Sequence, residues 1–213
     1  MQRRLYDAAI AQIGERGYDG ATLRDVATCV GVSPALLYRY FPNKRAVVLA
    51  LYDRLSETFA QEAAAMPAGR WRERFVYALE LSLHVLGPHR VPLRALTPAM
   101  VADGEEGIFA EGTAFSRLRV QGVFEAAVTG ATDAPKEKVT EALGRLLYLG
   151  HLGVILWWLL DRSPNQRATH GLVALVRQLL PPLALTLRLP FVRRSLESAH
   201  TLFQEALLGA TKA

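Results

Sequence analysis

The sequence has one cysteine, Cys29, and this excludes a fold held together by intramolecular disulfides. A lone cysteine suits the reducing cytosol. No neighbouring charge marks Cys29 as a thiolate, so we expect a small buried thiol rather than a redox sensor.

Long apolar runs are also missing. The most apolar stretch, LGVILWWLL, extends only from Leu152 to Leu160, whereas a membrane-spanning helix needs about 20 residues. The basic pair near the N-terminus is followed by Asp7 and Glu15, with no apolar segment of the signal-peptide type. The sequence therefore predicts a soluble, cytoplasmic protein with no membrane partner.

The motifs of catalysis and of metal binding are absent as well. There is no G-x-S-x-G, no phosphate-binding glycine loop and no pair of carboxylates at a catalytic spacing. The five histidines lack metal-ligand spacing. We therefore expect no catalytic residues, no metal, no cofactor and no enzymatic activity.

What the sequence does contain is helical periodicity. The 213 residues are 51% hydrophobic and 21% charged, which is typical of a globular protein with an ample core. The net charge of +5 permits an anionic partner without requiring one. Apolar residues recur at helical spacing nearly throughout, and no window alternates with a period of two. The predicted fold class is all-α, with about nine or ten helices.

Three short helices are predicted at the N-terminus. The first ends at Gly17. Thr22 can cap the second, which Gly31 ends. Ser33 can cap the third, because Pro34 then occupies the first helical position, where its missing N–H has no cost.

Longer helices are expected to follow, separated by segments rich in glycine, proline and capping residues. The segment DGEEG, residues 103–107, is expected to be an acidic surface turn. The expected helical ranges are 43–66, 70–87, 91–102, 107–130, 135–162, 165–188 and 191–208.

The connection between the second and third helices is only three residues long and begins with Gly31. Such a connection between two short amphipathic helices indicates a helix-turn-helix, whose second helix can enter the major groove of DNA. On the third helix Leu37 and Phe41 face the core, which leaves the other side for a partner. A helical hairpin with ordinary solvated charges fits the spacing equally well.

A longer pattern favours the first of these two alternatives. The segment TLRDVATCVGVSPALLYRYFPNKRAVV resembles the DNA-binding domain of the TetR family of bacterial transcriptional regulators. The resemblance covers residues 3–50, and the rest of the chain is similar only in length and helical pattern. The residues that carry it are Thr22, Val26, Ala27, Gly31, Val32, Ser33, Leu37, Tyr38, Phe41 and Lys44.

The resemblance implies two domains, a helix-turn-helix domain at 1–50 and a helical effector-binding and dimerisation domain at 51–213. It also implies roles for ten residues of the first domain. Tyr38 could instead be a half-buried core tyrosine, and Arg39 is either a DNA contact or a solvated arginine. The implied phosphate contacts are Thr22, Ser33, Tyr38, Tyr40 and Lys44, and the residues facing base edges are Arg24, Pro34, Ala35 and Leu36.

The three leading residues of the third helix, Pro34 to Leu36, are all apolar. They can contact thymine methyl groups but cannot make bidentate hydrogen bonds to bases. Arg24 is then the best candidate for reading a guanine directly. We expect specificity that depends on few base hydrogen bonds and partly on DNA shape.

One such module makes few contacts, and a two-fold dimer that reads two half-sites solves this. The resemblance implies a homodimer built from the last long helices, here 135–162 and 165–188. Both are apolar around more than one face, and a helix that is apolar on two sides is buried on two sides. The expected interface residues are Leu146, Trp157, Leu172, Leu175, Val176 and Leu179.

The family's middle helices usually enclose a small-molecule pocket. The candidate lining is poor in charge, which suits a hydrophobic or aromatic effector. Membership of the ordinary core is the alternative for each of these residues, and the simpler one. They are Phe75, Leu79, Leu83, Met100, Phe115, Phe124, Tyr148 and His151.

The sequence thus predicts a homodimeric repressor that binds a palindromic operator in double-stranded DNA and is released by a small apolar or aromatic effector. Two alternatives stay open. One is a small-molecule-binding or metabolic enzyme domain on an all-α scaffold. The other is an architectural DNA-binding protein without an effector.

Overall fold

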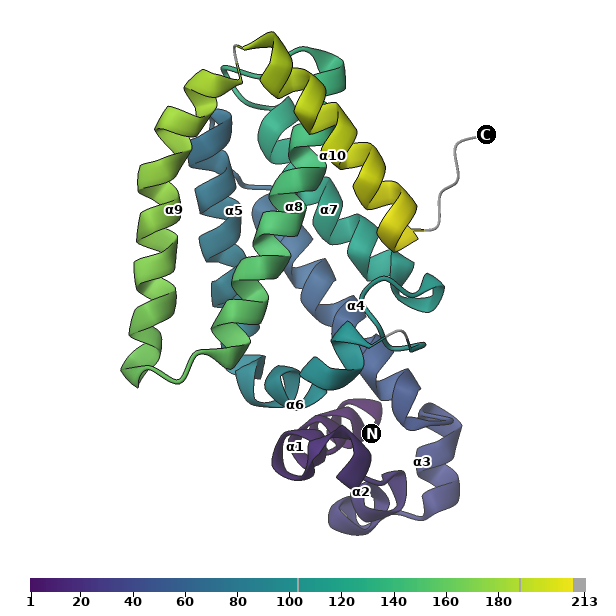
Figure 1. Ribbon diagram of the computed structural model, residues 1–213. Coiled ribbons are helices and arrows are strands. Elements are labelled where there is room, and N and C mark those ends of the chain that lie inside the picture. The colour runs from purple at the N-terminus through teal and green to yellow at the C-terminus, as the bar shows by residue number, and fades with distance from the viewer. Residues whose placement is uncertain (103, 188, 209–213) are drawn as a thin grey trace. The chain divides into compact units, whose positions relative to one another are not determined.

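The structure of the protein is a computed structural model that describes residues 1–102, 104–187 and 189–208 (Figure 1). These residues form ten α-helices, three short 3₁₀ helices and no strand, which confirms the all-α prediction. The α-helices are α1 (Gln2–Gly20), α2 (Leu23–Val30), α3 (Pro34–Tyr40), α4 (Lys44–Ala63), α5 (Trp71–Leu86), α6 (Arg90–Val101), α7 (Ala114–Thr129), α8 (Glu137–Leu160), α9 (Arg167–Thr186) and α10 (Pro190–Leu208). The 3₁₀ helices are η1 (Gly87–His89), η2 (Glu111–Thr113) and η3 (Pro164–Gln166).

The chain forms two compact units. Unit 1 consists of Met1–Glu57 and Leu86–Arg117, and unit 2 of Thr58–Val85 and the described part of Leu118–Ala213. The chain leaves unit 1 within α4 and returns to it after α5, so α6 belongs to the same unit as α1, α2 and α3. The functional domains predicted from the sequence, 1–50 and 51–213, stay a prediction.

Unit 1 is organised around α1, which packs against both α2 and α6. The approach of α6 is close at Gly14, where an added Cβ would lie 3.2 Å from Cγ1 of Val91. The regular part of α1 ends at Gly17, whose φ of 78° favours glycine. This agrees with the helix end predicted there.

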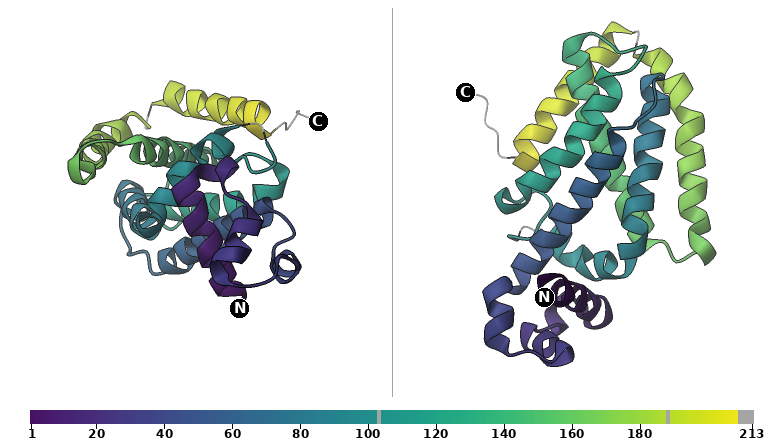
Figure 2. Two further views of the ribbon diagram at one scale, coloured as in Figure 1. Left: turned by 90° about the horizontal axis from the view of Figure 1, so that it is seen from below. Right: turned by 180° about the vertical axis from the view of Figure 1, so that it is seen from behind.

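In unit 2, α8 has contacts with both α9 and α10 (Figures 1 and 2). The stretch Val139–Leu160 of α8 is long and apolar enough to cross a membrane by length and composition, but half of it is buried in the structure. Such burial is typical of the core helix of a folded domain.

The helix expected over 107–130 begins later than predicted. After α6 the chain makes a turn and a short 3₁₀ helix, and α7 starts only at Ala114. The hydroxyl of Thr113 donates to the carbonyl oxygen of Gly107 at 2.7 Å, which closes the loop before the helix starts. Helical periodicity did not reveal this loop, because it gives no weight to a single side chain that bonds back to the main chain.

Candidate nucleic-acid interface

The α2–α3 hairpin is built by two side-chain caps and one glycine. The Thr22 hydroxyl accepts a hydrogen bond from the Asp25 amide at 3.1 Å, and the Ser33 hydroxyl accepts one from the Leu36 amide at 3.2 Å. Gly31 ends α2 in the left-handed region at φ 71°. Each capping hydroxyl uses a lone pair here, so its own O–H can still donate to a phosphate oxygen.

The two sides of α3 differ as the sequence predicted. Leu37 and the following Phe41 are buried in the core of unit 1. Pro34 and Ala35 are exposed at the N-terminal end of α3, and Leu36 is half-buried. The outward side therefore presents an apolar tip. The residues Tyr38, Arg39 and Tyr40 are also exposed.

Arg24 lies in the first turn of α2 and is exposed. Its carbonyl oxygen accepts a hydrogen bond from the Thr28 hydroxyl at 3.0 Å. Its guanidinium is thus placed on an exposed helix, as a base contact requires.

Lys44 has a role that the sequence pattern did not indicate. Its ammonium donates to the carbonyl oxygen of Tyr18 at 2.6 Å and to that of Asp19 at 3.4 Å, and it lies 4.6 Å from the centre of the Tyr18 ring. These contacts satisfy carbonyl groups at the end of α1. An ammonium has three N–H donors, so the predicted phosphate contact can coexist with these bonds.

The candidate pocket residues are divided between the two units. Five of them are buried in unit 2: Phe75, Leu79, Phe124, Tyr148 and His151. The ring of Phe124 is central, because the ring centroids of Phe75, Tyr148 and His151 lie 4.7–6.5 Å from its own. Two other candidates, Met100 and Phe115, belong to unit 1.

His151 is the buried polar group of this ring cluster. Its Nε2 lies 2.8 Å from the Ser82 hydroxyl, whereas its Nδ1 has no hydrogen-bond partner among the described residues. Burial lowers the pKa of His151 to about 3, so the ring is neutral at physiological pH.

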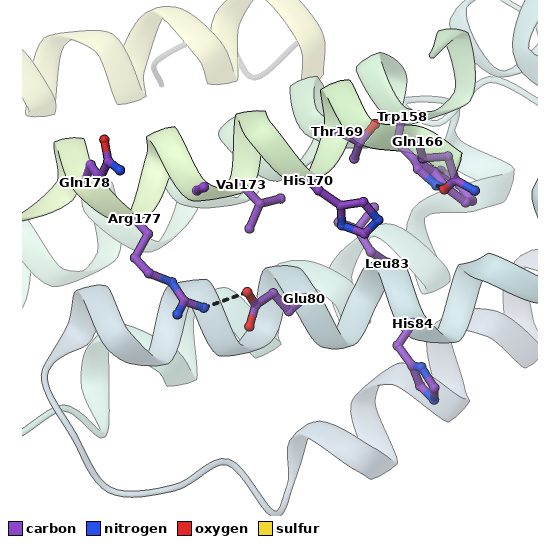
Figure 3. Close-up of a pocket in the computed structure, with 11 residues that line it drawn as sticks. Glu80, Leu83, His84, Trp158, Gln166, Thr169, His170, Val173, Arg177 and Gln178 are labelled. Atoms are coloured by element: carbon purple, nitrogen blue, oxygen red, sulfur yellow. Dashed lines mark hydrogen bonds and ion pairs between the residues drawn. The ribbon is translucent and has the colours of Figure 1, made fainter. Parts of the chain in front are cut away.

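Leu83 lines a groove between α5 and α9 (Figure 3). The groove has a cavity volume of about 650 Å³. An ion pair between Glu80 and Arg177, 2.6 Å apart, crosses it. At one end the indole N–H of Trp158 donates to Gln166 at 2.5 Å. Among these residues, the sequence indicated only Leu83.

The six candidate interface residues form part of the surface of unit 2. Trp157, Leu175 and Leu179 have exposed fractions of 50%, 49% and 56%. The other three, Leu146, Leu172 and Val176, are half-buried. Their role in a dimer interface stays a prediction.

Two further expectations concern single residue types. Cys29 is exposed, so the expectation of a buried thiol was wrong. It lies near the C-terminal end of the short helix α2, where the outward side of the helix faces solvent. Within the described residues, no group of three His, Cys, Asp or Glu side chains could hold a metal ion.

Comparison with known proteins identifies the hairpin region. Residues 5–51 match the family described as "Bacterial regulatory proteins, tetR family". The N-terminal region of this chain belongs to the TetR family. We call residues 5–51 the TetR region. All ten residues for which the resemblance implied a role in DNA contact lie within it.

Curated relatives of the TetR region include the HTH-type transcriptional regulator BetI of Brucella anthropi, 41% identical over 64 residues, or 30% of this chain and 33% of the relative. The negative regulator IcaR of the biofilm operon icaADBC in Staphylococcus aureus is 40% identical over 47 residues, or 22% of this chain and 25% of IcaR. The chain thus spans about a third or less of the length of these relatives.

The TetR likeness extends further in three dimensions. A TetR transcriptional regulator from Nitrosomonas europaea has a TM-score of 0.62 at 20% identity, covering 84% of this chain and 97% of that one. A tetR-family regulator from Streptomyces coelicolor has a TM-score of 0.63 at 18% identity, covering 94% and 88%. At these identities the likeness concerns the fold.

Proposed function

We propose that the protein is a homodimeric, cytoplasmic transcriptional repressor of the TetR type, which binds a palindromic operator and is released by a small apolar or aromatic effector. The observation that carries this proposal is the capped α2–α3 hairpin with its exposed outward side, inside the region that matches the TetR family. Proteins of this family are regulators and not enzymes, which supports a non-enzymatic role.

A gel-shift experiment with DNA from beside the protein's own gene tests DNA binding. One palindromic site should be bound at moderate salt, in preference to unrelated DNA of equal length. Binding that is uniform across sequences and lost as salt rises would instead support an architectural protein. No binding to any DNA would favour the enzyme or small-molecule-binding alternative.

Replacing Arg24 and replacing Tyr38 are expected to change DNA binding in different ways. Arg24→Ala should cost about 1–3 kcal/mol on the operator and relax the preference at one position of each half-site, because a guanidinium reads a guanine edge. Tyr38→Phe should weaken binding to all sequences alike, because a phenol reaches phosphate and carries no sequence information. Titration of a set of single-base operator variants separates the two patterns. An identical loss on every variant for both proteins would refute this division of roles.

The effector proposal is supported by the buried ring cluster of unit 2 and by the Nδ1 of His151, which has no hydrogen-bond partner among the described residues. α4 is one continuous helix that begins at the predicted phosphate contact Lys44 in unit 1 and ends in unit 2. We propose that the effector tilts α4 and changes the distance between paired recognition helices, which must be about 34–36 Å to fit successive major grooves.

Such a switch requires that effector and operator each lower the protein's affinity for the other by the same factor. An apolar effector that lowers operator affinity must bind operator-bound protein more weakly by the same factor, because the coupling free energy is reciprocal. Calorimetric titration of a candidate aromatic ligand into free and into operator-bound protein measures both affinities. Equal affinities for several good binders would contradict the switch.

A further inference from the structure

The acidic turn that precedes η2 is bonded to other parts of unit 1. The carboxylate of Glu106 accepts a hydrogen bond from the Tyr18 hydroxyl at 2.6 Å, across 88 positions of sequence. The main-chain oxygen of Glu106 accepts another from the Tyr52 hydroxyl at 3.2 Å. The adjacent Glu105 pairs with Arg45 at 2.8 Å. The expected acidic surface turn is therefore an anchored one; its Asp103 lies outside the described residues.

The shape of this turn is fixed locally. The amide of Gly107 donates to the carbonyl oxygen of Gly104 at 2.9 Å, and the Thr113 hydroxyl donates to the carbonyl oxygen of Gly107. A Cβ added to Gly107 would lie 2.5 Å from the main-chain oxygen of Ala102, so no larger residue fits without a shift. The carboxylate of Glu106 is thus held by a turn with little freedom.

Tyr18 connects this carboxylate to the start of α4. Its hydroxyl is bound by Glu106, while its ring and its carbonyl oxygen are both bound by the Lys44 ammonium. Burial, followed by the bond to Glu106, raises the pKa of the Tyr18 hydroxyl, so it remains a neutral donor to a carboxylate at physiological pH. Bonds of this charge-assisted type are the stronger ones in proteins.

We propose that Glu106 is a positioning residue for DNA binding, which acts through Tyr18 to place the Lys44 ammonium where a phosphate oxygen can meet it. The inference rests on the proposed function in requiring that the protein bind an operator. It assigns Glu106 no contact with DNA. Its effect passes along the series Glu106, Tyr18, Lys44, whose three members lie far apart in the sequence.

The test uses the 213-residue chain, four variants and one control variant, with operator affinity and its salt dependence measured by fluorescence anisotropy. Glu106→Ala and Tyr18→Phe should each weaken operator binding about tenfold, as loss of a hydrogen bond to a charged group does. The double variant should be no weaker than either single one, because both remove the same bond. Glu106→Gln keeps an oxygen that can accept from Tyr18 and should bind within about twofold of wild type.

The salt dependence separates positioning from general destabilisation. Loss of one phosphate contact per half-site makes the slope of log affinity against log salt shallower by about 0.9 for each contact. Thermal unfolding measured beside it should show that each variant is still folded at the assay temperature, so that a weaker operator affinity reports lost positioning and not unfolded protein. The control is Glu105→Gln, which makes the same change of charge on the same turn but leaves the bond to Tyr18, and it should not make the slope shallower.

Wild-type affinity and slope in Glu106→Ala would overturn the inference, as would equal losses in Glu106→Ala and Glu106→Gln. If Glu106→Ala does not fold, Tyr18→Phe still tests the same bond with the ring retained. A wild-type protein that binds no operator would refute the proposed function instead. In that event hydrogen exchange at amides 17–21 and 44–46 still decides this inference, since exchange no faster in Glu106→Ala than in wild type would refute the link from Glu106 to Lys44.

Discussion

Leu179→Glu is expected to convert the protein from a dimer to a monomer and to weaken binding to a full palindrome by about 100-fold or more, because the second half-site is then no longer held nearby. Leu179 is exposed on α9, and in a dimer its side chain would be removed from water. A carboxylate placed there has no partner, and burying an unpaired charge is costly.

Light scattering measures the change directly. Wild-type protein should have twice the chain mass of 23.5 kDa at micromolar concentration, and Leu179→Glu should have the mass of one chain. The matched control is Gln178→Glu, which places the same charge on the neighbouring residue of α9 that lines the groove of Figure 3. A monomeric wild type that still binds the full palindrome tightly would contradict the dimer proposal.

Acidification is expected to destabilise the protein through His151. The pKa of His151 is about 3 in the folded state, against an ordinary value of 6.5, because burial disfavours the charged ring. Between these values the unfolded chain binds a proton that the folded chain does not. The stability contributed by the neutral ring is therefore present above pH 6.5 and is lost as pH falls towards 3. Between pH 7 and pH 4 the loss is about 3 kcal/mol.

Urea unfolding at a series of pH values measures this loss. The Ser82→Ala, His151→Phe double variant removes both partners of the buried hydrogen bond and should reduce the acid sensitivity. Some sensitivity should persist, because burial also lowers the pKa values of His89 and His200. His170→Gln, a change at an exposed position, is the control. An unchanged pH dependence in the double variant would show that His151 does not have the lowered pKa.

The parts of unit 1 that could be predicted from the sequence are those determined by neighbouring residues. A cap bonds an amide three positions away and a glycine ends its own helix, so Thr22, Gly31 and Ser33 could be interpreted without knowledge of the fold. The two sides of α3 could also be predicted, because the spacing of its apolar residues separates the buried side from the exposed side.

The contacts that were missed connect residues far apart in the chain. Nothing near Tyr18 in the sequence indicates a carboxylate at 106, and nothing near Lys44 indicates that its ammonium binds α1. Met100 and Phe115 belong to unit 1 and not to the unit that holds the ring cluster, and helical periodicity could not show this, because it says that a residue is apolar but not which unit it joins. Their role in a pocket stays a prediction.

Unit 1 is made of two segments that are separated in the chain by part of unit 2, and this matters for the construction of hybrid regulators. A chimaera made by joining the first 50 residues of one such regulator to the remainder of another would pair an α1 and an α6 that come from different proteins. In this chain that boundary would separate Gly14 from Val91, whose side chain approaches it closely, and Tyr18 from Glu106. A graft that transfers Leu86–Arg117 together with Met1–Glu57 keeps both contacts. The exchangeable part is therefore defined by packing rather than by one position in the chain.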